Sequence, residues 1–280
     1  MSAWLNRSLI VRRLVRLGHP RLREVRARRV LSPLVAWVER GILYVPQGHL
    51  EGLCFDLRHL PISHAHLGGI AFGALETAVQ EALVRHLGPG GVLYDVGANV
   101  GFFSLLGARL AGPAGHVYAF DPAPDNAAAI RRNAALNALE NVSVIAKAVS
   151  AGAGTGRLQV VDDQSWSKLA EYGAHPLTER VLKVELVAVD DLVAAGEARP
   201  PTVVKIDVEG AELAVLEGMR ATIDAYRPAI ICELHDTHRE FLAAMAARGY
   251  RVINLEGAGP VSEQGASAHA LALPALDPGE

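Results

Sequence analysis

Apolar and polar positions follow a repeating pattern from residue 92 onward. Short apolar runs alternate there with longer stretches whose apolar residues recur at helical spacing. The runs predict strands at 92–96, 116–120, 142–149, 203–206 and 229–234, and the stretches between them predict helices at 100–111, 124–137, 211–225 and 237–248. This alternation indicates an α/β protein with a mostly parallel sheet and helices on both faces. In such sheets, ligands bind beyond the carboxyl ends of the strands, near the point where the strand order reverses.

The remaining predicted elements lie before, within and after this pattern. They are short strands within 41–62, an inserted β pair at 158–161 and 181–189, and a closing β-hairpin at 250–255 and 269–273. A helix over 74–87 ends at the run Gly88-Pro89-Gly90-Gly91, which is a strong stop signal. The pattern therefore predicts a partly helical arm at 1–40, a lead-in segment at 41–90 that we interpret as a lid, and a main α/β domain at 91–276.

Charge divides the chain in a way that the net value of -3 hides. Residues 1–40 contain ten Arg, two Glu and neither Lys nor Asp, a net charge of +8, which leaves -11 for the rest. This basic arm has three readings: it lies on an anionic membrane, it binds an anionic acceptor or nucleic acid, or it is a solvated extension that packs on the core. Because the arm lies outside every motif described below, we expect it to influence where the protein works rather than its chemistry.

Composition excludes several classes of protein. No apolar run reaches the ~20 residues of a membrane-spanning helix, and arginines interrupt the N-terminal segment where a secretory signal needs an apolar core. The two cysteines, Cys54 and Cys232, lie far apart, which argues against a disulfide framework and against a cysteine-rich zinc site. We therefore expect a cytoplasmic protein, with peripheral attachment at the inner face of the membrane as the alternative, and we expect no nucleic-acid partner.

A glycine loop follows the first predicted strand of the main domain. The segment runs Asp95-Val96-Gly97-Ala98-Asn99-Val100-Gly101, and the two glycines allow a tight turn and a close approach to a ligand. A dinucleotide site would instead have the spacing G-x-G-x-x-G. Asp95 beside the loop would repel a phosphate but suits a ligand with a cationic part. A tight turn without a ligand is the plainer alternative.

Two acidic segments follow later strands of the predicted sheet. Asp121, in Phe120-Asp121-Pro122, stands where a carboxylate can accept both hydroxyls of a ribose, or else cap the next helix. The segment Lys205-Ile206-Asp207-Val208-Glu209-Gly210-Ala211-Glu212 places Asp207 at the end of an apolar strand, where an unused acid is costly. For Glu209 a capping role and a functional role are about equally favoured, whereas for Glu212 helix capping is favoured.

These motifs, in this order, resemble the FkbM-type methyltransferases over about residues 76–234. The resemblance rests on Y-D-V-G-A-N-V-G-F-F-S, A-F-D-P, V-D-D-L and above all K-I-D-V-E-G-A-E-L-A-V-L-E-G. It implies a Rossmann-like class I methyltransferase fold with a seven-stranded sheet, the cofactor S-adenosyl-L-methionine, and O-methylation of a sugar, a glycolipid or another small natural product. It further implies Asp95, Gly97, Asn99 and Gly101 around the methionine part of the cofactor and Asp121, usually Glu in the family, on its ribose. Val149, at the end of the third predicted strand, is added to the expected cofactor contacts.

Methyl transfer to an alcohol benefits from a base beside the acceptor oxygen. Glu233 and His235 follow the fifth strand and alternate with Leu234, so they are expected to point to the same side, with Cys232 facing the other way. We hypothesise that Asp207 and His235, together with Glu233, handle the acceptor hydroxyl. The same acids could bind Mg²⁺, but nothing in their spacing requires a metal and none is predicted.

Two other functions compete with methyl transfer. One is a Rossmann oxidoreductase that uses a nicotinamide cofactor, although the loop lacks its fingerprint. The other is a non-catalytic module of the same fold in surface-polysaccharide assembly. Trp166 and Tyr172, in the insertion at 162–180, are candidate contacts for the acceptor. The sequence does not indicate the acceptor or the oligomeric state.

Overall fold

The computed structural model describes residues 41–58, 64–161, 167–173 and 176–275. Two compact units divide the chain, Met1–Thr77 and Ala78–Glu280. The described part of the first unit contains a two-stranded antiparallel sheet, β1 (Ile42–Tyr44) with β2 (Cys54–Asp56), and helix α3 (His64–Ala71). The basic arm at 1–40 and Trp166 lie outside the described residues, so their predicted roles stay predictions.

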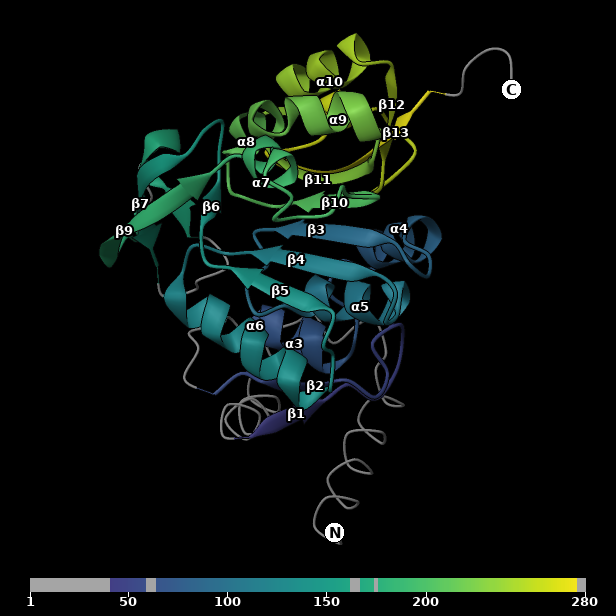
Figure 1. The fold of residues 1–280 in the computed structure, drawn as a ribbon, viewed down its shortest axis with the longest axis vertical. Coiled ribbons are helices and arrows are strands. Elements are labelled where there is room, and N and C mark those ends of the chain that lie inside the picture. The colour runs from purple at the N-terminus through teal and green to yellow at the C-terminus, as the bar shows by residue number, and fades with distance from the viewer. Residues whose placement is uncertain (1–40, 59–63, 162–166, 174–175, 276–280) are drawn as a thin grey trace, which may run out of the picture. The chain divides into compact units, whose positions relative to one another are not determined.

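A seven-stranded sheet forms the centre of the second unit (Figure 1). Its order is β12-β13-β11-β10-β3-β4-β5, with bounds Tyr250–Asn254, Ser267–Pro274, Ala229–His235, Val203–Ile206, Val92–Val96, His116–Phe120 and Val142–Ile145. β13 runs antiparallel to β11 and β12, and the other pairs are parallel. The predicted seven-stranded, mostly parallel sheet with a closing hairpin is confirmed.

Helices connect and flank these strands. They are α4 (Thr77–His86), α5 (Phe102–Ala111), α6 (Pro124–Leu136), α7 (Val189–Ala194), α8 (Glu212–Gly218), α9 (Arg220–Tyr226) and α10 (His238–Ala247). In Figure 1, α5 and α6 lie beside β3, β4 and β5, and α8 to α10 lie beside β10 to β13. Every residue of β3 and β10 is buried, as expected for central strands covered on both faces.

A smaller sheet interrupts the alternation between the fifth and the tenth strands. It has the order β6-β9-β7-β8, with bounds Ala148–Val149, Arg180–Val187, Gly154–Val160 and Lys168–Leu169, and the turn η3 (Ala170–Tyr172) follows β8. The inserted β pair predicted at 158–161 and 181–189 corresponds to β7 and β9, which pair in an antiparallel register from Gly154 opposite Leu186 onward.

Two predicted elements are divided in the structure. The strand predicted at 142–149 breaks into β5 and β6 because a tight turn intervenes, in which the N–H of Lys147 donates to the carbonyl of Ile145 (2.8 Å). Val149 therefore belongs to the smaller sheet. The helix predicted at 211–225 is two helices, because the backbone leaves the helical conformation at Met219 (φ -126°, ψ 19°).

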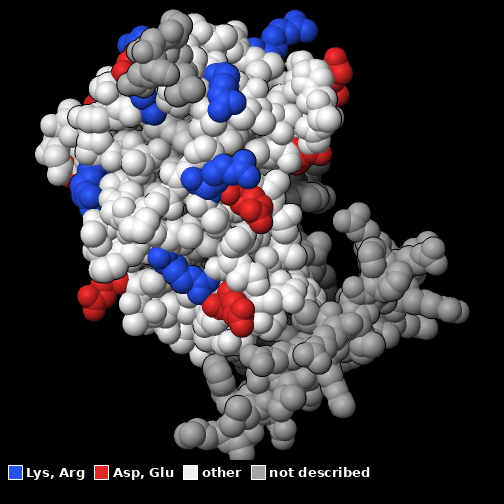
Figure 2. Space-filling model, turned by 90° about the vertical axis from the view of Figure 1, so that its right-hand side faces the viewer, with Lys and Arg blue, Asp and Glu red and all other residues white. Residues whose placement is uncertain are grey.

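Charges of both signs lie on one face of the described surface. On the face shown in Figure 2, the described Lys and Arg side chains lie scattered among Asp and Glu side chains rather than in one basic patch. Among the described residues, no helix is both long and apolar enough to cross a bilayer.

Candidate active site

The loops after β3 and β10 meet in the centre of the sheet. The two strands are hydrogen-bonded neighbours, but the chain continues from β3 to one side of the sheet and from β10 to the other, so the strand order reverses here. The backbone N–H of Asp207 donates to the carbonyl of Val96 (3.0 Å). A Cβ atom on Gly97, which has φ +82°, would lie 1.8 Å from the carbonyl oxygen of Asp207. Only glycine fits this approach, which brings the glycine loop against the acidic segment.

Four backbone N–H groups of the glycine loop donate hydrogen bonds within the protein. The N–H groups of Gly97 and Ala98 donate to the carbonyl of Phe120 (both 3.0 Å). Those of Gly101 and Asn99 donate to the carbonyl of Ala98 and to the carboxylate of Asp121 (both 2.8 Å). A dinucleotide-binding loop offers such groups to a pyrophosphate. These four N–H groups are engaged instead, which favours a ligand without a phosphate at this position.

Asp95 and Asp121 are both buried beside this loop. Asp95, in β3, accepts a hydrogen bond from the hydroxyl of Ser104 in α5 (2.5 Å). Asp121 is 5% exposed and accepts from the N–H groups of Asn99 and Ala123 (2.8 and 2.9 Å) and from the amide of Asn126 (3.2 and 3.3 Å). Burial raises the pKa of Asp121 to about 7, and these hydrogen bonds oppose the rise.

Asp121 therefore braces the loop and the start of α6. Both of its oxygens accept from the protein, but the N-cap of α6 is Ala123 and no side chain caps this helix, so Asp121 contacts the start of α6 without capping it. Its predicted contact with a ribose stays a prediction. Val149 is 3% exposed and lies in β6, so its predicted cofactor contact stays a prediction too.

The three predicted catalytic side chains come together beyond the carboxyl ends of β10 and β11. Asp207 follows β10, while Glu233 and His235 end β11. Donor atoms of the three lie within 4.8 Å of one another, and Nε2 of His235 is 3.6 Å from Oε1 of Glu233. Glu233 and His235 point to the same side of β11. Leu234 between them and Cys232 before them are both buried.

Glu212 holds His235 in place. Its side chain is fully buried at the start of α8, and Oε1 lies 2.8 Å from Nδ1 of His235. The same carboxylate accepts from the N–H of Gly210 (2.9 Å) and from the hydroxyl of Thr237 (3.2 Å). The sequence favoured helix capping for Glu212, but the structure shows a carboxylate that orients the imidazole so that Nε2 faces the other acids.

Glu209 joins this cluster from a strained position. It is a non-glycine residue with φ +52°, a conformation that costs about 1–3 kcal/mol and is concentrated at functional sites. Its Oε2 lies 3.6 Å from Nε2 of His235, and Oε1 of Glu233 lies at the same distance from that nitrogen. Burial, partly opposed by the charge of His235, raises the pKa of Glu209 to about 7.

His235 carries a positive charge at neutral pH in this setting. Burial by itself lowers its pKa, but the hydrogen bond with Glu212 and the charges of the neighbouring carboxylates raise it to about 9. The imidazolium offsets part of the negative charge of Glu209, Glu212 and Glu233. Because it is already protonated at neutral pH, His235 is suited to hold and orient carboxylates rather than to accept a proton.

The hairpin strand β13 adds residues that the sequence did not single out. Glu233 pairs across the strands with His269, and His235 with Ser267. The hydroxyl of Ser267 donates to Oε1 of Glu233 (2.6 Å), while Nε2 of His269 is 3.4 Å from Oε2. Burial alone raises the pKa of Glu233, but His269 and Ser267 lower it to about 2. Glu233 is therefore a poor proton acceptor, and its carboxylate stays negatively charged at neutral pH.

A lysine anchors Asp207 from within the sheet. Lys205 is 3% exposed in β10, and its Nζ donates to Oδ2 of Asp207 (3.0 Å). The same ammonium lies over the ring of Phe103 in α5, 4.8 Å from the centroid. The charge of Asp207 is thus compensated by Lys205, which lies in the strand that Asp207 follows.

The insertion reaches this site through Tyr172. A Cβ atom on Gly210 would lie 3.9 Å from the Cβ of Tyr172, so the turn η3 passes over the loop that carries Glu209. The Tyr172 side chain is 38% exposed. The structure therefore places Tyr172, a candidate acceptor contact, beside the acidic segment.

The cluster contains side chains of the types that bind metal ions. Asp207, Glu233 and His235 supply two carboxylates and an imidazole, which are ligand types that divalent cations accept. The protonated His235 already places a positive charge among these carboxylates. What the arrangement offers directly is a set of anionic groups, one of them with a pKa near neutrality, beside a glycine loop.

Comparison with known proteins places these features in one family. The profile described as Methyltransferase FkbM domain matches residues 95–252. The hexuronic acid methyltransferase AglP of Haloferax volcanii is 32% identical over 51% of this chain and 56% of its own length. The 31-O-demethyl-FK506 methyltransferase FkbM of Streptomyces tacrolimicus is 29% identical over 69% of this chain and 86% of its own. The crystal structure of methyltransferase FkbM from Methylobacillus flagellatus KT aligns over 69% of this chain and 50% of that chain, with 16% identity and a TM-score of 0.44.

Proposed function

Because the chain belongs to the FkbM methyltransferase family, whose profile spans more than half of it, we propose that it transfers a methyl group from S-adenosyl-L-methionine to a hydroxyl of a small-molecule acceptor. The acceptor classes proposed are a sugar, a glycolipid or another small natural product. The names of two relatives, one a hexuronic acid methyltransferase and one a 31-O-demethyl-FK506 methyltransferase, support a hydroxylated acceptor.

One observation carries the proposal: the glycine loop and the acidic segment touch at the reversal of strand order. Gly97 approaches the carbonyl of Asp207 more closely than any side chain would allow. A cofactor at the first loop would therefore present its reactive group to an acceptor at the second. Such alignment of two reactants can remove about 7–11 kcal/mol from a bimolecular barrier.

The residues of the loop fit this cofactor at one end. The N–H groups that a phosphate would use are engaged, and the acid Asp95 lies beside the loop, which suits a cationic methionine part. When bound, S-adenosyl-L-methionine supplies a methyl group on a positively charged sulfur that becomes a neutral thioether on transfer. Gly97, Asn99 and Gly101 would hold the methionine part, and Asp121 supports them from behind.

Glu209 is the group that we assign to the acceptor proton. As the C–O bond to the methyl carbon forms, the acceptor O–H bond breaks and its proton passes to the carboxylate of Glu209, which becomes a neutral acid. A base is most effective when its pKa lies near the working pH, and burial raises the pKa of Glu209 to about 7. Asp207, Glu233 and His235 surround the same position and orient the acceptor and the base.

Two assays in sequence test the proposed function. Calorimetry with the full chain is expected to show binding of S-adenosyl-L-methionine and none of NAD. Transfer of a labelled methyl group to sugars, lipids and polyketides is then expected to give a product that survives mild alkali, as an ether does and a methyl ester does not. Binding of NAD would favour the oxidoreductase alternative, and cofactor binding without transfer to any acceptor would favour the non-catalytic module.

A further inference from the structure

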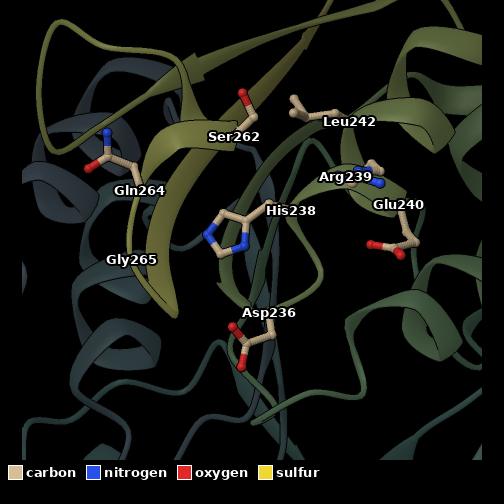
Figure 3. Close-up of a pocket in the computed structure, with 8 residues that line it drawn as sticks. All are labelled: Asp236, His238, Arg239, Glu240, Leu242, Ser262, Gln264 and Gly265. Atoms are coloured by element: carbon tan, nitrogen blue, oxygen red, sulfur yellow. The ribbon is translucent and has the colours of Figure 1, made fainter.

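A polar hollow lies at the start of α10, beyond the end of β11 (Figure 3). Its volume is about 480 Å³, within the range of roughly 300–1,000 Å³ typical of small-molecule sites. It is lined by Asp236, His238, Arg239, Glu240, Leu242, Ser262, Gln264 and Gly265. Leu242 is the sole member of this set with an apolar side chain, so the hollow suits a ligand rich in hydrogen-bonding groups.

Two residues that line the hollow stand next to or near cluster residues in the chain. Asp236 follows His235 in the chain, and its N–H donates to the carbonyl of Ala266 (2.9 Å). Gly265 on the facing wall stands two residues before Ser267, whose hydroxyl binds Glu233. A ligand in the hollow is therefore bordered by the same two strand ends, of β11 and β13, that carry the cluster.

The turn at Asp236 separates these two neighbours. Asp236 has φ +57°, a left-handed conformation that is uncommon for residues other than glycine, although Asp and Asn adopt it more readily than most. Strained backbone of this kind is concentrated at binding and catalytic sites. The turn leaves His235 in the cluster while Asp236 lines the hollow.

His238 lines this hollow, and one of its ring nitrogens is buried. Its Nε2 is buried and has no hydrogen-bond partner among the described residues. Figure 3 shows the imidazole ring in the middle of the hollow, between Asp236 and the segment that carries Gln264 and Gly265.

The lining groups indicate which ligand this is. Asp236 and Glu240 can each accept two neighbouring hydroxyls, as carboxylates do with the two hydroxyls of a ribose. The side chains of Ser262, Gln264 and His238 can each donate and accept hydrogen bonds. This matches a ligand ring that carries hydroxyls on several sides. With two carboxylates and the single arginine Arg239, the lining has no excess of positive charge to favour a phosphate, and the scarcity of apolar side chains disfavours an extended hydrocarbon surface.

We propose that this hollow binds a sugar ring of the acceptor through its hydroxyls, and so directs another hydroxyl of the same molecule to the cluster at Glu209. The inference rests on the proposed function and narrows its acceptor to a sugar. It assigns Asp236 and Gln264 to binding of the acceptor, without contact with the reacting atoms.

Binding of simple glycosides to the full chain tests the hollow without requiring turnover. The probes are methyl α-D-glucopyranoside, methyl α-D-galactopyranoside and methyl α-D-mannopyranoside, added to the full chain both with and without an excess of S-adenosylhomocysteine and observed by saturation-transfer NMR. At least one is expected to bind, and Asp236→Asn and Gln264→Ala are each expected to weaken it about tenfold, the effect of losing a hydrogen bond. Asp236→Asn keeps a residue that tolerates the left-handed turn.

A matched control and a second readout separate the possible failures. Asp224→Asn changes an exposed carboxylate of α9 that faces Arg248 outside the hollow, and is expected to leave glycoside binding within a factor of two. Calorimetry with S-adenosylhomocysteine should give the same affinity for all the proteins. If no glycoside binds, or if the two hollow variants bind as the wild type does, the hollow is not a sugar site. If glycosides bind at the hollow but the wild type fails to bind S-adenosylhomocysteine, the methyltransfer proposal fails and the sugar site stands.

Discussion

The glycine loop and the acidic cluster lie against each other, yet they differ in how their polar groups are satisfied. In the loop, four backbone N–H groups and both oxygens of Asp121 are paired within the protein. In the cluster, Glu209, Glu212 and Glu233 surround one imidazolium, and the pKa values move in opposite directions, to about 7 for Glu209 and about 2 for Glu233. The loop is held in one conformation by these hydrogen bonds, whereas the cluster contains one carboxylate, Glu209, whose charge changes near neutral pH.

Gly97→Ala should give the largest effect, because it attacks the contact between the two regions. The new Cβ atom would lie 1.8 Å from the carbonyl oxygen of Asp207, and neither backbone can move without breaking the sheet. We expect loss of detectable binding of S-adenosyl-L-methionine in calorimetry, together with a clear fall in melting temperature. Overpacking of this kind typically lowers the free energy of unfolding by about 1–3 kcal/mol.

Gly112→Ala is the matched control for this substitution. Gly112 also has positive φ (+64°) but has open space around its Cβ position. Because its backbone conformation (φ +64°, ψ -175°) is one that residues other than glycine rarely adopt, the variant should lose about 1–3 kcal/mol of stability and keep full binding of the cofactor. Equal loss of binding in both variants would show that the close contact at Gly97 is not what matters.

Glu209→Gln tests the reactive side of the comparison. Removing a general base typically slows turnover about 10²–10⁴-fold. We expect a loss in kcat of at least about a hundredfold with unchanged affinity for S-adenosyl-L-methionine, because the loop does not use Glu209. Glu217→Gln, an exposed glutamate on α8 paired with Arg220, should leave kcat within a factor of two. If the two variants had equal activity, Glu209 would have no part in the chemistry.

His235→Gln should reduce stability in a pH-dependent way. The pKa of His235 is raised from 6.5 to about 9 in the folded chain, so its charge stabilises the fold below pH 6.5 and that contribution disappears as the pH rises through 9. At pH 6 the variant should lose up to about 3 kcal/mol of unfolding free energy, and the deficit should shrink by pH 9.5. Urea unfolding at both pH values measures this, and a deficit that grows with pH would contradict the assignment of charge.

A chelator should have the smallest effect. Because the imidazolium already stands among the carboxylates of the cluster, we expect turnover after EDTA treatment and gel filtration to stay within a factor of two of its starting value. If activity fell to background and returned with Mg²⁺ or Mn²⁺, Asp207, Glu233 and His235 would instead be metal ligands.

Local signals in the sequence predicted the sheet and the positions of the two loops well. Strands β3 and β10 begin and end where the apolar runs do, and Asp207, Glu233 and His235 converge because parallel strands end at one edge of the sheet. Periodicity alone also showed that Glu233 and His235 share a side, since alternate residues of a strand face the same way.

What the sequence did not reveal depends on contacts between distant segments. Ser267 and His269 reach Glu233 only through the antiparallel register of β11 with β13, which no local pattern specifies. Glu212 looks like an ordinary acid at a helix start, and its role appears only when the chain brings His235 back to within 2.8 Å of it. The bracing role of Asp121 likewise depends on Asn99 and Asn126 folding around it.

The central claim is that Glu209 accepts the proton of the acceptor in a cluster held by the neighbouring glycine loop. Single-turnover methyl transfer with saturating cofactor, measured from pH 5 to 8.5, tests it most directly. The wild-type rate should rise about tenfold per pH unit up to about pH 7, where Glu209 loses its proton, and then level off. Glu209→Gln should be at least about a hundredfold slower and show no such rise. A variant that kept the wild-type rate and the same rise with pH would contradict the claim.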